Sequence, residues 1–122
     1  MVQEAVLHEI EAGDLRVFVV WEPILRLDDE GAARKATALF PDSRVEHFWA
    51  PNQSVGELFQ QPLALDSEPA WDVYLVYDRG VRWDGPHPPV PTYFMHRLRG
   101  RLPDSQILDG EKMAEQIRRF LR

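Results

Sequence analysis

The amino-acid sequence predicts an α/β fold with parallel strands first and an antiparallel pair of strands late in the chain. Segments with helical periodicity alternate with short runs rich in β-branched residues, an order typical of parallel strands joined by helices. Late in the chain, two apolar runs, 71–77 and 81–83, flank a tight turn and predict an antiparallel hairpin. The length of 122 residues suits a single domain, residues 1–122, with one core.

The first half of the chain predicts two helices and two parallel strands. Apolar residues recur at helical spacing over 2–11 and predict the first helix. The run DLRVFVVW, residues 14–21, is nearly continuous in apolar residues and predicts a strand covered on both faces. Asp28 or Asp29 offers an N-cap for the second helix, and RVEHFW, residues 44–49, predicts the second strand.

The middle of the chain predicts a short helix, a loop and the hairpin. Asn52 can cap the short helix, and two prolines among small and acidic residues predict a loop over 61–70. In AWDVYLVYDRGVRW, the strand 71–77 is followed by a turn in which Gly80 supplies a positive φ. Residues 81–83 are then expected to return antiparallel to that strand.

The last third of the chain predicts one more extended segment and a final helix. TYFMHRL, residues 92–98, suits either an edge strand or an ordered loop. Asp109 is an N-cap for a helix to about residue 121, with one apolar face.

Composition excludes several classes of protein. A hydrophobic fraction of 44% with 28% charged residues is close to globular averages, which argues against global disorder. The net charge of −6 without a basic stripe argues against general nucleic-acid binding. There is no apolar run of membrane-helix length and no basic, apolar leader, so a soluble, cytoplasmic protein with no membrane association is expected. The absence of cysteine excludes thiol catalysis and thiolate metal sites within this chain.

Four phrases of the sequence carry a resemblance to a known family. VFVVWEPIL, ARKATALFPDSRVEHFW, AWDVYLVYDRGVRW and PTYFMHRL occur in this order over residues 14–98. They resemble a group of bacterial thioredoxin-like proteins related to thiol–disulfide oxidoreductases. The resemblance implies a thioredoxin-like three-layer α/β/α sandwich with a mixed sheet, shortened at its N-terminus.

The chain departs from that family where redox chemistry would reside. Catalytic thioredoxin-like proteins carry C-x-x-C at the start of the helix that corresponds to 2–11, after a strand in the middle of the sheet. Without that strand, the strands 14–21 and 71–77 would face each other across an empty position, with unpaired backbone groups. Three arrangements remain open: the two strands pair directly, a partner chain supplies a strand, or the natural gene product begins upstream.

Five residues are candidates for a binding groove at one end of the sheet. By the resemblance, Asp72 stands where thioredoxins have a cis-proline beside the substrate groove. Tryptophans at strand ends can line a ligand cleft or simply pack in the core. The two histidines can each be structural, or can bind Zn²⁺ or Fe²⁺ with a carboxylate, although no tight ligand spacing supports a metal. The candidates are Trp71, Asp72, Trp83, His47 and His96.

The sequence therefore predicts a non-catalytic thioredoxin-like domain that acts in protein binding or assembly, as a homodimer or with another protein. No dithiol redox activity and no cofactor are expected of this cysteine-free chain. One alternative is the C-terminal part of a thiol–disulfide oxidoreductase whose C-x-x-C segment lies upstream. A second alternative is a small metal-binding protein that uses His47 and His96.

Overall fold

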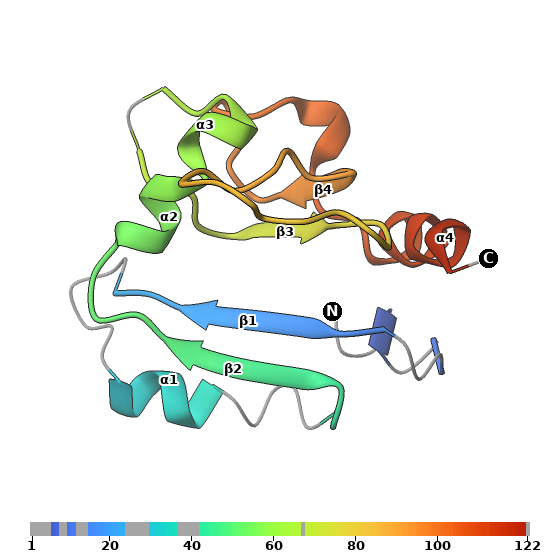
Figure 1. Cartoon of the computed structure of the whole chain (residues 1–122), viewed down its shortest axis with the longest axis horizontal. Helices are drawn as coiled ribbons and strands as arrows, with labels where there is room; N and C mark the ends of the chain where they lie inside the picture. The colour runs from blue at the N-terminus through green and yellow to red at the C-terminus, as the bar shows by residue number, and fades with distance from the viewer. Residues whose placement is uncertain are drawn as a thin grey trace.

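The computed structural model describes residues 6–7, 10–11, 15–23, 30–36, 42–66 and 68–121. Within these residues the chain is a mixed α/β structure with two small sheets and no closed barrel (Figure 1). Its elements in chain order are β1 Val17–Trp21, α1 Glu30–Ala36, β2 Val45–Trp49, α2 Ser54–Leu58, α3 Gln60–Leu63, β3 Val73–Val76, β4 Tyr93–His96, a 3₁₀ turn Asp104–Gln106 and α4 Gly110–Phe120.

The first sheet consists of the parallel strands β1 and β2, which lie within the predicted strands 14–21 and 44–49. The register pairs Val17 with Val45 and Trp21 with Trp49. The Val17 amide donates to Arg44 O at 3.1 Å, and the Ala50 amide donates to Trp21 O at 2.9 Å. Because backbone groups alternate in direction along a strand, residues 17, 19 and 21 hydrogen-bond toward β2.

The second sheet pairs β3 with β4 in antiparallel, and it corrects the predicted hairpin. Val73 lies opposite His96 and Val76 lies opposite Tyr93, so 92–98 contains a strand and 81–83 does not. Gly80 has the predicted positive φ, +90°. The chain continues past it through exposed residues and the proline-rich segment 86–91, in which the prolines lack the amide donors that a ladder needs.

Both faces of the β3–β4 sheet are covered by apolar clusters. One face, with Tyr74 and Met95, packs against Val6, Ile10 and α4. The other face, with Leu75 and Phe94, packs against side chains from α3 and the 98–102 segment. This sheet and its two coverings hold the described part of the apolar core.

Hydrogen bonds between described residues join the two sheets at two main places. At one, the Gly56 amide donates to Glu22 Oε1 at 2.7 Å, and the Ala70 amide donates to Gly56 O at 2.9 Å. A Cβ on Gly56 would lie 2.5 Å from Ala70 O, so this close approach requires glycine. At the other, the Arg44 guanidinium donates to Ile10 O at 2.5 Å and to Leu7 O at 2.6 Å.

The helices agree with the sequence only in part. Asp109 caps α4 as predicted, because its Oδ1 accepts from the amides of Glu111 and Lys112. Asn52 Oδ1 accepts from the Ser54 amide at the start of α2, while α3 occupies the beginning of the predicted loop 61–70. Most of the predicted helix 2–11, and the proposed caps Asp28 and Asp29, lie outside the described residues.

One expectation about burial is wrong. The continuous apolar run of β1 predicts burial on both faces, yet Phe18 and Val20 are 61% and 42% exposed. No described element covers that face of the β1–β2 sheet, whereas the opposite side of β1 is half-buried.

Candidate functional site

Among the described residues, β1 and β3 each have one strand edge that carries no ladder. Residues 17, 19 and 21 bond toward β2, so the backbone groups of Phe18 and Val20 point away from it. Asp72 O accepts from the Arg97 amide and Val76 O accepts from the Thr92 amide, both toward β4. The backbone groups of Val73 and Leu75 therefore point away from β4. We call these the open edges of β1 and β3.

The two open edges lie alongside each other in opposite directions. Leu15, just before β1, packs on the cluster that holds Tyr74 and Val76 from β3. At the other end of β1, Glu22 meets Gly56, which in turn bonds Ala70 just before β3. Figure 1 shows the same arrangement, with the arrows of β1 and β3 opposed and no strand between them. Among the backbone hydrogen bonds of the described residues, none joins β1 to β3, so the direct pairing considered above is not adopted.

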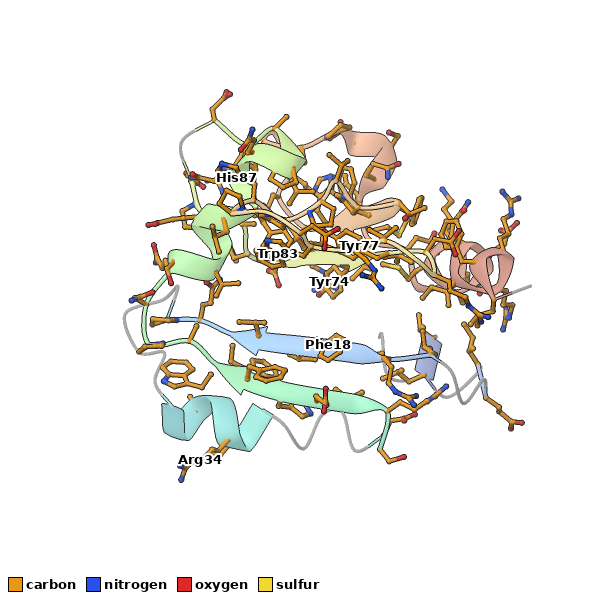
Figure 2. All side chains as sticks on the ribbon, in the orientation of Figure 1. Phe18, Arg34, Tyr74, Tyr77, Trp83 and His87 are labelled. Atoms are coloured by element: carbon orange, nitrogen blue, oxygen red, sulfur yellow. The ribbon has the colours of Figure 1, made fainter. Side chains whose placement is uncertain are left out.

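An exposed aromatic pair adjoins the open edge of β1. The rings of Phe18 and Phe48 have their centroids 6.3 Å apart, and Phe48 is 51% exposed. Figure 2 labels Phe18 on β1 and shows Tyr74 on the side of β3 toward β1. The open edge and the exposed face together form an apolar surface of the kind that marks interaction sites.

An acidic residue follows β1, and another precedes β3. Glu22 is half-buried, and its burial raises the pKa of its carboxyl, with Glu57 adding repulsion and the Gly56 amide opposing it. Asp72 is exposed at the start of β3. Burial also raises the pKa of the Tyr74 phenol, with repulsion from Asp72 adding and Arg97 opposing.

Asp72 and Trp71 stand directly before β3. Asp72 has a φ of +49°, a left-handed conformation that aspartate tolerates better than most residues. Trp71 is half-buried against the cluster that includes Leu63 and Leu98. No cis peptide bond occurs in the described segments, so Asp72 does not reproduce the backbone of a cis-proline.

The two candidate histidines lie in different sheets with different partners. His96 is fully buried in β4; its Nδ1 accepts from the Leu98 amide at 2.9 Å, and its Nε2 lies 2.7 Å from Pro103 O. A carbonyl can only accept, so Nε2 carries the proton. His47 in β2 stacks on Trp21 with centroids 6.2 Å apart, and its Nδ1 accepts from Trp21 Nε1 at 3.2 Å.

Trp83 belongs to the segment after β3 rather than to a strand. Its ring meets Phe59 edge-on at 6.0 Å, its Nε1 donates to Gly85 O at 2.7 Å, and half of it is exposed. Phe59 and Trp71 share one cluster, so these two tryptophans lie near the same helices while His47 lies in the other sheet. Over the residues that are described, no group of three His, Asp or Glu side chains suited to a metal occurs.

A hollow of about 520 Å³ occurs elsewhere, between α2, α3 and the proline-rich segment. It is open to solvent and contains none of the five candidate residues. Its walls are Ser54, Glu57, Leu58, Gln60, Gln61 and His87.

Comparison with family models, with curated proteins and with solved structures finds no match to this chain. Over the described residues, none of the helices has the length and apolar character that crossing a membrane requires. The site is therefore defined by its own geometry: two open strand edges, an exposed aromatic pair, and the neighbouring carboxylates of Glu22 and Glu57 after β1. Sequence reasoning missed the roles of Glu22 and Gly56, for which no local motif exists.

Proposed function

We propose that this chain is a non-catalytic thioredoxin-like domain that binds another polypeptide through the open edges of β1 and β3. Unpaired edges are templates for strand addition, a common mode of peptide recognition. The single observation that supports the proposal is that two such edges face each other in one fold. The exposed Phe18 and Phe48 beside them add apolar surface for a partner to cover.

A selection from displayed random ten-residue peptides against the immobilised chain tests this function. The variant Val20→Pro removes an amide that points to the open edge but breaks no bond of the β1–β2 ladder. Val81→Lys is the control, because Val81 has the same 42% exposure as Val20 and lies outside the strands. We expect enriched peptides that bind wild type and Val81→Lys but not Val20→Pro. If the enriched peptides bind Val20→Pro as well as wild type, or if no peptide is enriched, the proposed function is wrong.

The same open edges favour one alternative, the C-terminal part of a thiol–disulfide oxidoreductase. In the family that the sequence resembles, the strand before the C-x-x-C motif is central in the sheet. A strand encoded upstream could then occupy the position between β1 and β3. Genomic DNA before codon 1 that encodes an apolar strand followed by C-x-x-C would support this alternative, and insulin reduction by the longer chain would test it.

No observation favours the metal-binding alternative. His47 and His96 lie in separate sheets, and both ring nitrogens of His96 already have backbone partners. We therefore do not propose it.

A further inference from the structure

The geometry of the open edges restricts what can bind between them, a restriction that rests on the proposed function. A segment placed between β1 and β3 must form backbone hydrogen bonds with both strands at once. A strand that already belongs to a sheet has only one edge to offer. A second folded copy of this chain therefore cannot pair with both strands through an intact sheet, whereas a lone extended segment has both of its edges free.

The direction of the flanking strands sets the pairing. β1 and β3 run in opposite directions (Figure 1), so a segment between them is parallel to one and antiparallel to the other. Phe18 and Val20 offer backbone groups on one side, and Val73 and Leu75 offer them on the other. With β1 five residues long, about five residues of the occupant can pair.

The residues around the open edges determine which side chains the inserted segment needs. On one face, the neighbours of such a segment are Leu15, Tyr74 and Val76, which belong to an apolar cluster. By alternation along the two strands, Phe18 of β1 and Leu75 of β3 point to the other face. A strand that lies between two strands and is apolar on both faces has a continuous apolar run rather than an alternating one.

The carboxylates of Glu22 and Glu57 add a charge preference. Glu22 directly follows β1 and lies close enough to Glu57 for repulsion, whereas Asp72, directly before β3, has Arg97 opposite it, directly after β4. A basic residue that flanks the apolar run at the end of β1 is attracted to Glu22 and Glu57, and an acidic one is repelled.

We propose that the partner is a separate polypeptide that inserts an extended, continuously apolar segment of about five residues, flanked by a basic residue, between β1 and β3. The segment is unpaired before it binds, as in a disordered region or a chain terminus. Its backbone bonds both edges, its side chains complete both apolar faces, and the basic residue lies near Glu22.

Binding of designed peptides tests which kind of segment binds between β1 and β3. The probe is a dye-labelled, capped peptide of five valine, isoleucine and leucine residues with one lysine at each end, followed by fluorescence anisotropy. Its first comparison peptide is identical but N-methylated on alternate amides, which removes donors to one edge. Its second comparison peptide has glutamate in place of both lysines.

We expect saturable one-to-one binding of the lysine-flanked peptide. N-methylation should weaken it by about tenfold or more, because several backbone hydrogen bonds are lost together. The glutamate ends should weaken it also, and the difference should shrink as salt is added. Because the comparison peptides leave the protein unchanged, the test does not depend on a variant that folds.

Three results would overturn the proposal. Equal binding of the N-methylated peptide would show that strand pairing is not the mode of recognition. A dimer by sedimentation that Val20→Pro dissociates would identify a second copy, through exchanged strands, as the occupant. Loss of peptide binding in a chain extended by its upstream codons would identify its own segment as the occupant.

The failure of this inference and the failure of the proposed function are distinguishable. If the displayed library yields Val20→Pro-sensitive peptides that are polar or proline-rich, the binding function stands and the apolar occupant is wrong. If the library yields nothing sensitive to Val20→Pro, both are wrong.

Discussion

His96 shows how a candidate ligand residue can be fully engaged in holding its own fold. Its Nδ1 accepts from the buried Leu98 amide and its protonated Nε2 donates to Pro103 O. These bonds fasten the chain after β4 to the end of that strand. The residue is fully buried, so a ligand could reach it only if this segment moved.

We expect His96→Leu to lower the free energy of unfolding by about 1–3 kcal/mol, mainly because the Leu98 amide loses its acceptor inside the protein. His96→Asn keeps an acceptor near the Nδ1 position and should recover part of the loss. Urea denaturation measures both, with the exposed His87→Leu as control. A His96→Leu chain as stable as wild type would contradict this account.

Gly56 is required for its size rather than for its backbone angles. An added Cβ would lie 2.5 Å from Ala70 O and 2.9 Å from Glu22 Oε2. Backbone atoms cannot yield as a flexible side chain can, so Gly56→Ala forces α2 away from the start of β3. We expect a loss of about 1–3 kcal/mol, typical of overpacking, by thermal or urea denaturation.

Gly85→Ala is the matched control, because no atom lies within 4 Å of the position that a Cβ would take there. It should be neutral or slightly stabilising, since alanine restricts the unfolded chain. Equal stability of the two alanine variants would show that the Gly56 junction does not hold the sheets together.

At the scale of elements, the Asp42–Arg44 pair fixes the start of β2. Arg44 donates to Asp42 through Nε at 2.9 Å and through Nη2 at 2.7 Å, while its guanidinium also holds the carbonyls of Leu7 and Ile10. These bonds lower the pKa of the Asp42 carboxyl from 3.8 to about 2. Asp42 therefore keeps Arg44 oriented toward the N-terminal segment.

Because the pKa of Asp42 is lowered in the folded protein, the free energy of unfolding depends on pH in the acidic range. Because the folded value lies below the unfolded one, the unfolded chain takes up the proton first as pH falls. The contribution of Asp42 is thus complete above about pH 4 and is lost as pH falls toward about 2. Denaturation at several pH values should show this loss in wild type and a shallower one in Asp42→Asn. Parallel pH profiles would contradict the assignment.

The elements that local sequence determines are predicted well, and those that depend on distant residues are not. VFVVW and VEHFW are strands because β-branched and aromatic residues dominate them, and Asp109 caps α4 through its own side chain. The predicted partner of β3 is wrong, because a tight turn at Gly80 suggests a local hairpin while the actual partner begins at Tyr93. No local sequence pattern indicates that the partner strand comes only after the proline-rich segment 86–91.

The candidate site likewise combines features that local sequence predicts with features that depend on distant residues. From the resemblance, the sequence left three arrangements open for the strands 14–21 and 71–77, and one of them, direct pairing, is not found among the described residues. The grouping of His47 with His96 rests on analogy, and the structure puts them in different sheets. The exposure of Phe18 could not be predicted from an apolar run, because the run is the same whether or not an element covers that face.

At the scale of the whole molecule, the two sheets differ in how well they are protected from water. The β3–β4 sheet has an apolar cluster on each face, whereas the β1–β2 sheet leaves Phe18 and Phe48 exposed on one face. The sheets are joined by side-chain and helix contacts and not by a ladder in the described residues. Local opening therefore costs less in the β1–β2 sheet.

Native-state hydrogen exchange measures this difference directly. We expect the Tyr74 amide, which points to β4, to exchange more slowly than the Val19 amide, which points to β2, because β3 is covered on both faces. Within each strand, the open-edge amides of Val20 and Leu75 should exchange faster than these paired neighbours. Addition of the lysine-flanked peptide should slow Val20 and Leu75 far more than Val19 and Tyr74, because only the first two gain hydrogen-bond partners. Uniform slowing of all four amides would instead indicate general stabilisation of the fold by binding elsewhere, and it would separate the open edges from the site of recognition.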